Sequence, residues 1–135
     1  MHNWNCLHIF AKSIYMKETQ DNIIAVKSKL FALRIIRLYK YLCNQKNEFV
    51  ISKQILRSGT SIGANVRESI RAQSKADFIA KMSISLKEAS ETEYWLELLT
   101  ESDYIGKEEG ESIMKGCQEI ISILTKIIKT AKNAK

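Results

Sequence analysis

The chain has 135 residues, of which 45% are hydrophobic and 27% are charged, and it contains no proline. This length allows one domain with its own core and is too short for two ordinary domains. The 21 lysine and arginine residues exceed the 15 aspartate and glutamate residues, which gives a formal net charge of +6. Clusters of β-branched residues between turn residues are missing, which excludes a sheet protein. No apolar run reaches the roughly 18 residues of a membrane helix.

Residues 1–15 look different from the rest of the chain. Their apolar stretch CLHIFA follows no basic region and precedes no small-residue cleavage site, so it is not a signal peptide. We expect residues 1–20 to be a poorly structured leader, or to precede the true start of the protein. Residues 21–135 are expected to form the domain.

Four segments show the periodicity of amphipathic helices, in residues 23–44, 52–73, 74–102 and 108–131. In the first, apolar residues recur at steps of three, four and seven, and two leucines widen the apolar face; the positions are Ile24, Phe31, Ile35, Leu38 and Leu42, with Leu30 and Leu33 beside them. The expected N-caps are Ser52 for the second segment and Ser74, followed by Asp77, for the third. Because each apolar stripe must be buried against the others, the pattern predicts an all-α, up-down antiparallel four-helix bundle.

The stretch RSGTSIGAN, from Arg57 to Asn65, raises the question of a glycine-rich phosphate loop. Such a loop lies between a strand and a helix, and a P-loop ends in Gly-Lys-Ser or Gly-Lys-Thr; neither condition is met here. On a helix, Gly59 shares the packing stripe with Val66, and Gly63 lies at its edge. A helical glycine costs about 1 kcal/mol relative to alanine, so we expect a neighbouring backbone to approach closely.

A row of small polar residues lies beside this stripe. It can hydrogen-bond across a close helix contact, within the chain or with another subunit, and it consists of Ser58, Ser61, Asn65 and Ser69.

The remaining face of the same segment is basic. Five basic side chains line it, namely Lys53, Arg57, Arg67, Arg71 and, just beyond, Lys75. A solvated face and a surface for phosphates explain such a stripe about equally well. Base-reading motifs are absent, so a nucleic-acid contact here would be to backbone and shape rather than to sequence.

Three stretches resemble one known family: KLFALRIIRLYKYL (Lys29–Leu42), LRSGTSIGANVRES (Leu56–Ser69) and SLKEASETEYWLELL (Ser85–Leu99). They are similar to bacterial four-helix-bundle proteins encoded in intervening sequences of 23S rRNA genes, and to the related accessory variability determinant proteins of diversity-generating retroelements. The resemblance covers about residues 20–131. It implies a homopentameric barrel with a central channel; in the retroelement branch, the barrel is basic and binds reverse transcriptase and nucleic acid.

The resemblance also points to residues on two helices. Those in the second-helix motif are Arg57, Ser58, Ser61, Asn65 and Glu68, and those in the third-helix motif are Glu88, Glu91, Trp95 and Leu96. Because semi-buried charges need partners, we expect Arg57 and Asn65 to contact Glu88 or Glu91. The predicted helix-packing or oligomer interface therefore consists of Ser58, Gly59, Ser61, Gly63, Asn65, Glu88, Glu91 and Trp95.

Cysteine and histidine patterns indicate no metal, disulfide or nucleophile. Three widely spaced cysteines without a C-x-x-C pair favour a reducing cytoplasm; they are Cys6, Cys43 and Cys117. A di-iron bundle, or a serine or cysteine hydrolase, needs histidine within the bundle, and the chain has only His2 and His8.

An enzymatic alternative rests on acidic pairs. Glu88-x-x-Glu91 and Glu108-x-x-Glu111 loosely resemble the E-x-x-E elements that bind magnesium in all-helical nucleotide pyrophosphohydrolases. Acids in the first turn of a helix, however, favour the helix dipole without any metal.

We therefore predict a non-enzymatic, cytoplasmic homo-oligomer without cofactor, metal or membrane association. The expected partners are further copies of itself, as a homopentamer, and RNA or DNA through the phosphate backbone, with a reverse transcriptase as a further candidate. The alternatives are a purely structural, protein-binding oligomer and a magnesium-dependent nucleotide pyrophosphohydrolase.

Overall fold

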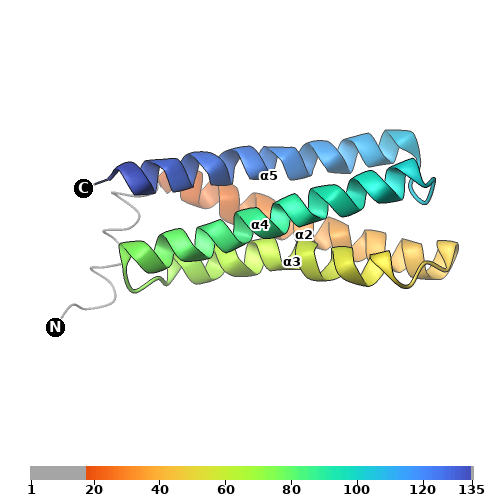
Figure 1. The fold of residues 1–135 in the computed structure, drawn as a ribbon, viewed down its shortest axis with the longest axis horizontal. Coiled ribbons are helices and arrows are strands. Elements are labelled where there is room, and N and C mark those ends of the chain that lie inside the picture. Colours follow the sequence, from red (N-terminus) through yellow and green to blue (C-terminus); the bar gives the residue numbers. More distant parts are fainter. Residues whose placement is uncertain (1–17, 135) are drawn as a thin grey trace.

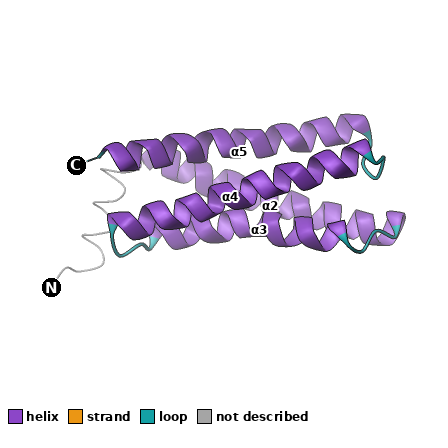
Figure 2. Ribbon diagram, viewed as in Figure 1, coloured by secondary structure: helices purple, strands orange, loops and turns teal. Residues whose placement is uncertain are grey.

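The computed structural model describes residues 18–134, which form helices joined by short turns (Figures 1 and 2). The helices are α2 (Glu18–Lys46), α3 (Ile51–Ile70), α4 (Lys75–Glu101) and α5 (Lys107–Asn133). No strand occurs in this part of the chain. The predicted all-α four-helix bundle is confirmed, whereas the leader expected in residues 1–20 lies mostly outside the described residues.

Consecutive helices run up and down beside one another. The α2–α3 and α4–α5 turns lie at one end of the bundle, and the α3–α4 turn lies at the other end, with the C-terminus (Figure 1). Packing is most extensive between α3 and α4, while α2 and α5 pack over fewer residues than the other neighbouring pairs. The side between α2 and α5 is therefore the most open side of the bundle.

The core follows the predicted periodicity, with one correction. Ile24, Ile35 and Leu42 of α2 are fully buried. Leu30 and Leu33 were expected to widen this face, and that expectation is wrong, because their side chains are 59% and 43% exposed. At 100° per residue, Leu33 lies on the opposite side of the helix from Ile24. Helix α2 thus carries a second apolar face that the described residues leave exposed.

The N-terminus of α3 is capped by a residue that the sequence did not indicate. Ser52 is not the N-cap, because it lies inside the first turn, where its hydroxyl faces the Cys43 thiol at 3.7 Å. Instead, the buried Glu48 carboxylate accepts hydrogen bonds from the amides of Val50, Ile51 and Ser52 at 3.3, 3.1 and 2.7 Å. A carboxylate at this position also faces the positive end of the helix dipole.

The boundary between α3 and α4 is partly as predicted. The Ser74 hydroxyl accepts from the Asp77 amide at 3.0 Å, so the predicted cap is confirmed. Helix α3, however, ends at Ile70 rather than at residue 73. The amides of Arg71 and Ala72 donate to carbonyls three residues earlier, which tightens the last turn before the chain reverses.

Gly59 allows α2 and α3 to approach closely. A Cβ atom at this position would lie 2.8 Å from both Cγ atoms of Ile35, which is fully buried. Gly63 faces Ser28 of α2 less tightly. A Cβ atom at this position would lie 3.4 Å from the Ser28 carbonyl oxygen. The glycines of RSGTSIGAN therefore serve a helix contact and not an anion.

We predict that Gly59→Ala lowers the free energy of unfolding by about 1–2 kcal/mol. The clash with Ile35 costs about 1–3 kcal/mol, and the better helix propensity of alanine offsets up to about 1 kcal/mol of that cost. Urea denaturation measures the difference. The matched control is Gly116→Ala, where a Cβ would make ordinary contact with Phe31 at 3.7 Å; this variant should be equally or more stable than the parent.

The cap of α3 yields a second prediction. Glu48→Ala leaves three amides without their acceptor and should destabilise the protein by about 1–2 kcal/mol. Ser52→Ala should cost less, because the Ser52 hydroxyl does not cap the helix. Thermal unfolding followed by circular dichroism distinguishes the two, and a larger loss in Ser52→Ala would contradict the assignment of the cap to Glu48.

Candidate nucleic-acid interface

Arg57 joins α3 to α4 through two carboxylates. Its Nη1 and Nη2 donate to both oxygens of Glu88 at 2.7 and 3.2 Å, and Nη2 also donates to Glu91 at 2.5 Å. The Trp95 indole donates to the same Glu91 oxygen at 3.0 Å. The Glu88 side chain is only 16% exposed, so its charge needs this two-pronged partner. We refer to Arg57, Glu88, Glu91 and Trp95 as the Arg57 cluster.

The contacts of the cluster favour the charged forms of Arg57 and Glu91. Hydrogen bonds to Glu88 and then to Glu91 raise the pKa of Arg57 above its ordinary value. The hydrogen bond from Trp95, together with the Arg57 guanidinium, lowers the pKa of Glu91. Because that carboxyl has a lower pKa in the folded state, its stabilising contribution is present at neutral pH and is lost only as the pH falls through the folded pKa. The cluster therefore joins α3 to α4 at neutral pH.

Asn65 does not take part in this cluster, contrary to expectation. Its side-chain amide donates to the Ser61 carbonyl at 2.8 Å, one turn earlier in α3. Ser61 in turn donates to the Arg57 carbonyl at 2.6 Å. Local acceptors on the same helix are closer than the carboxylates of α4, and short polar side chains commonly bond to the preceding turn. The expectation holds for Arg57 and is wrong for Asn65.

Buried hydroxyl groups line the contact between α3 and α4. Thr92 donates to the Ser58 hydroxyl at 2.8 Å, and Ser85 donates to the Ile62 carbonyl at 2.8 Å. Ser58, Ser85 and Thr92 have no exposed surface. Each buried hydroxyl thus has a partner, which small side chains at a close helix crossing make possible.

The predicted basic face divides into two groups. Lys53, Arg67 and Arg71 are exposed and form no ion pair with the described residues. Arg57 is held by the two glutamates of its cluster, and Lys75 donates to the carbonyl of Ala134 at the end of α5. The first group is available to an external anion, whereas Arg57 and Lys75 hold helices together.

Two further lysines belong to the same surface and were missed from the sequence. Lys29 lines the groove between α2 and α3 together with Arg67, and Lys40 lies three helical turns beyond Lys29 on the same face of α2. Both lysines are exposed. The charge count could have revealed them, because residues 23–71 contain ten basic and two acidic residues. We call Lys29, Lys40, Lys53, Arg67 and Arg71 the α2–α3 basic surface.

The other half of the bundle has the opposite charge. Residues 72–134 contain eight basic and eleven acidic residues. Several of these acids neutralise cations of α2 and α3: Glu119 pairs with Lys27, and Glu109 pairs with Arg34, in addition to the Arg57 cluster. The cations of the α2–α3 basic surface form no ion pair with these carboxylates in the described part of the chain.

The chemistry of the described residues offers little else. No group of three or more His, Cys, Asp or Glu side chains in residues 18–134 is arranged to hold a metal ion. Burial raises the pKa of the Cys117 thiol to about 12, which makes it a poor nucleophile at neutral pH. None of the helices in the described part is long and apolar enough to cross a membrane.

Comparison with known proteins places the chain in a family. The family model described as 23S rRNA-intervening sequence protein matches residues 20–126. The chain belongs to this family. A protein of unknown function from Bacteroides thetaiotaomicron, of the S23 ribosomal protein family, has a similar crystal structure, with a TM-score of 0.81 and 60% sequence identity. The match covers 82% of this chain and 98% of that chain. No curated protein matches.

The resemblance to the 23S rRNA intervening-sequence proteins, drawn from the helix motifs, is thereby confirmed. Several residues of these motifs make helix contacts in this chain. Gly59 and Gly63 face α2, and Ser58 faces α4. Arg57 and Trp95 contact glutamates of α4.

We predict that Arg57→Met destabilises the protein by about 1–2 kcal/mol at neutral pH. The substitution leaves the half-buried Glu88 and Glu91 without a cation, and the loss should shrink as acid protonates them. Urea denaturation at pH 7 and at pH 3 measures both effects. The matched control is Lys27→Met, whose exposed pair with Glu119 should leave the free energy of unfolding unchanged. Equal losses in both variants would contradict a special role for the Arg57 cluster.

Proposed function

We propose that this protein is a non-enzymatic, cytoplasmic homo-oligomer that binds RNA or DNA through the phosphate backbone. The observation that supports this proposal is the α2–α3 basic surface. Five exposed cations gather there and form no ion pair with any carboxylate in residues 18–134, while the carboxylates of α4 and α5 neutralise other cations of the bundle. Neighbouring unpaired cations raise the local positive potential and attract polyanions.

The geometry favours contact with phosphates over reading of bases. The cations lie on the adjacent outer faces of α2 and α3. Side chains that read bases would instead need to enter a groove of the nucleic acid from a protruding helix or strand. Backbone contacts fix the position of a protein on a nucleic acid without giving sequence specificity. RNA is the first ligand to test, because the description of the family refers to 23S rRNA.

Self-assembly is the second part of the proposal. The family resemblance implies a homopentamer, and the uncovered apolar face of α2 supports association, since exposed apolar stripes of this kind usually mark contact sites. In an oligomer, several copies of the α2–α3 basic surface would act together, which raises the affinity for a long polyanion. By the same resemblance, a reverse transcriptase is a further candidate partner.

The alternative is an oligomer that only binds protein. The exposed apolar residues of α2 favour it as much as they favour self-assembly. The two functions differ in their response to salt, because only a phosphate-binding surface releases condensed counterions. A magnesium-dependent hydrolase is less well supported, because both acids of Glu88-x-x-Glu91 already bind Arg57.

We predict that affinity for double-stranded nucleic acid falls steeply with salt. Each neutralised phosphate contributes about −0.9 to the slope of log K against log salt for B-DNA, so contact by all five cations gives a slope of about −4.5. Gel-shift titrations between low and moderate salt measure this slope with a DNA duplex, and a parallel RNA series tests the preferred ligand.

A charge-removing variant locates the surface. Arg67→Gln with Arg71→Gln should weaken binding and reduce the magnitude of the slope by about 2. The matched control is Lys126→Gln with Lys129→Gln, because these two lysines are exposed on α5 and lie outside the α2–α3 basic surface. No binding at low salt, or equal losses in the two double variants, would contradict the proposal.

A further inference from the structure

The exposed apolar residues of α2 form a regular seam. Ile23, Val26, Leu30, Leu33 and Tyr41 are 38%, 55%, 59%, 43% and 41% exposed. The first four follow one another at steps of three, four and three, and Tyr41 lies on the same side after one more pair of turns. This row is separate from the buried row of α2, which packs inside the bundle. We call these five residues the α2 seam.

The spacing of the α2 seam fits a helix as its occupant. Alternating steps of three and four are those of the a and d positions of a coiled coil, where the side chains of one helix fit between those of another. A helix with a single apolar face buries that face within its own bundle and needs no further helix. Helix α2, by contrast, has apolar residues on its inner side and also on its outer side. A helix lying along the seam would cover both the apolar residues and the open side of the bundle.

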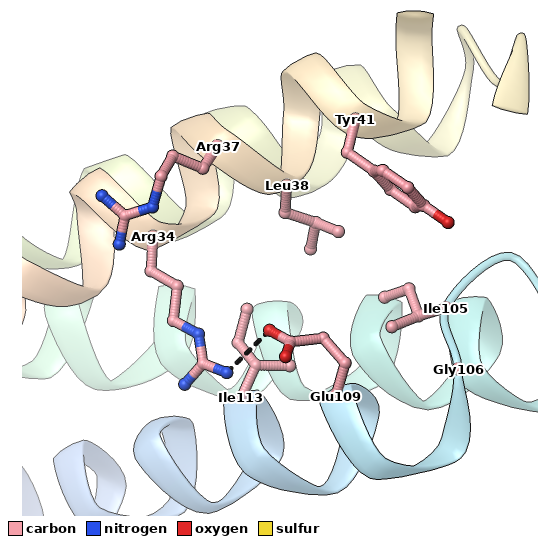
Figure 3. A pocket seen from close by; sticks show the side chains of 8 residues that line it. All are labelled: Arg34, Arg37, Leu38, Tyr41, Ile105, Gly106, Glu109 and Ile113. Carbon is pink, nitrogen blue, oxygen red and sulfur yellow. Dashed lines mark hydrogen bonds and ion pairs between the residues drawn. The ribbon is translucent and has the colours of Figure 1, made fainter. Parts of the chain in front are cut away.

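Hollows along the neighbouring side offer space for the side chains of that helix. One hollow of about 500 Å³ lies near Tyr41, between α2 and the start of α5, and it continues toward Leu30 and then Ile23 as two more. Figure 3 shows the first of them: Arg34 reaches across to Glu109, while the Arg37 guanidinium points away from this pair. Arg37, which lies on the same side of α2 between Leu33 and Tyr41, forms no ion pair with the described residues.

Charge restricts the identity of the helix. Residues 23–46 contain six basic residues and no acidic residue. A second α2 is disfavoured as the partner, because it would bring two sets of like charges together. The seam requires a helix whose apolar residues are flanked by acids.

Helix α4 of the same protein meets this requirement. Between Glu88 and Glu101 it contains five glutamates and no basic residue; Glu88 and Glu91 bind Arg57 of the same chain, which leaves the later glutamates for a partner. On its outer side, Ile84 and Tyr94 are 41% and 54% exposed, and Glu97 and Glu101 are exposed without an ion pair to any described residue. The outer positions also follow one another at steps of three and four; they are Ile84, Lys87, Glu91, Tyr94, Leu98 and Glu101. We call this row the α4 outer face.

We infer that the α2 seam of one copy binds the α4 outer face of a second copy. The inference rests on the proposed self-assembly and assigns its contact surfaces. Because each copy carries one seam and one outer face, the contact is heterologous, and it generates a ring where the rotation closes. Glu97 and Glu101 of one subunit then complement Arg37 of the next, while the cations on α3 stay outside the contact.

Two double variants and their mixture test this pairing. The seam variant is Leu30→Ser with Leu33→Ser, and the face variant is Ile84→Ser with Tyr94→Ser. All four side chains are at least 41% exposed, so the bundle should still fold, which circular dichroism checks. Size-exclusion chromatography with light scattering gives the mass, against 15.5 kDa for one chain.

Each variant alone should be monomeric, because every contact requires both surfaces. An equal mixture should form a complex of two chains and nothing larger, since the intact face of the seam variant binds the intact seam of the face variant. The matched control is Phe49→Ser with Val50→Ser, an apolar pair that is 51% and 73% exposed at the α2–α3 turn and outside both rows. This control should assemble as the parent does.

The other outcomes overturn the inference. If the parent assembles and the seam variant does too, the seam is not the contact, although the proposed self-assembly stands. If only the face variant keeps the parent mass, another surface occupies the seam. Two monomeric variants that fail to combine overturn the pairing, because each row is then needed for assembly without binding the other. A monomeric parent overturns both the inference and the self-assembly on which it rests.

Discussion

The close packing of α3 between its two neighbours is the constraint on which the rest of the structure depends. Gly59 lets α2 approach until Ile35 touches the backbone of α3, and Ser58, the preceding residue, meets Thr92 of α4 in a buried hydrogen bond. Larger side chains at either position would push a neighbour away, since protein interiors are close-packed. This packing fixes the register of three helices. It also decides which side of α3 remains outside, and there Lys53, Arg67 and Arg71 lie.

The same register decides which charges are used within the molecule. Arg57 reaches Glu88 and Glu91 because α4 crosses beside it, and Trp95 secures the second carboxylate. The acids of α5 neutralise cations on the near side of α2. Cations on the far side of α2 and on the outside of α3 form no ion pair with the described residues. The net charge is therefore positive on the α2–α3 half of the bundle and negative on the α4–α5 half. A molecule built in this way offers one surface to polyanions and another to basic partners.

Helix α2 joins these two properties. Its inner row fills the core, and its outer row is apolar with basic flanks, so it serves the bundle and a contact outside it at the same time. Both rows run along the same helix with the same period, so their residues alternate along the sequence. The acidic α4 complements this helix in both apolar spacing and charge, and the two lie on different sides of the bundle. That arrangement suits a contact that passes from one copy to the next.

The sequence by itself determined the fold class, the four helices, the Ser74 cap, the packing role of the glycines and the family. These features depend on local periodicity and on residue types, which a single chain displays directly. Only the tertiary structure decided that Glu48 caps α3, that Asn65 bonds to its own helix, and that Leu30 and Leu33 face outward. It also showed that Arg57 and Lys75 hold helices together, whereas Lys53, Arg67 and Arg71 face solvent. Finally, it added Lys29 and Lys40 of α2 to the α2–α3 basic surface. The reason is geometric: helical periodicity tells which residues share a face, whereas the partner of that face depends on how neighbouring helices are placed.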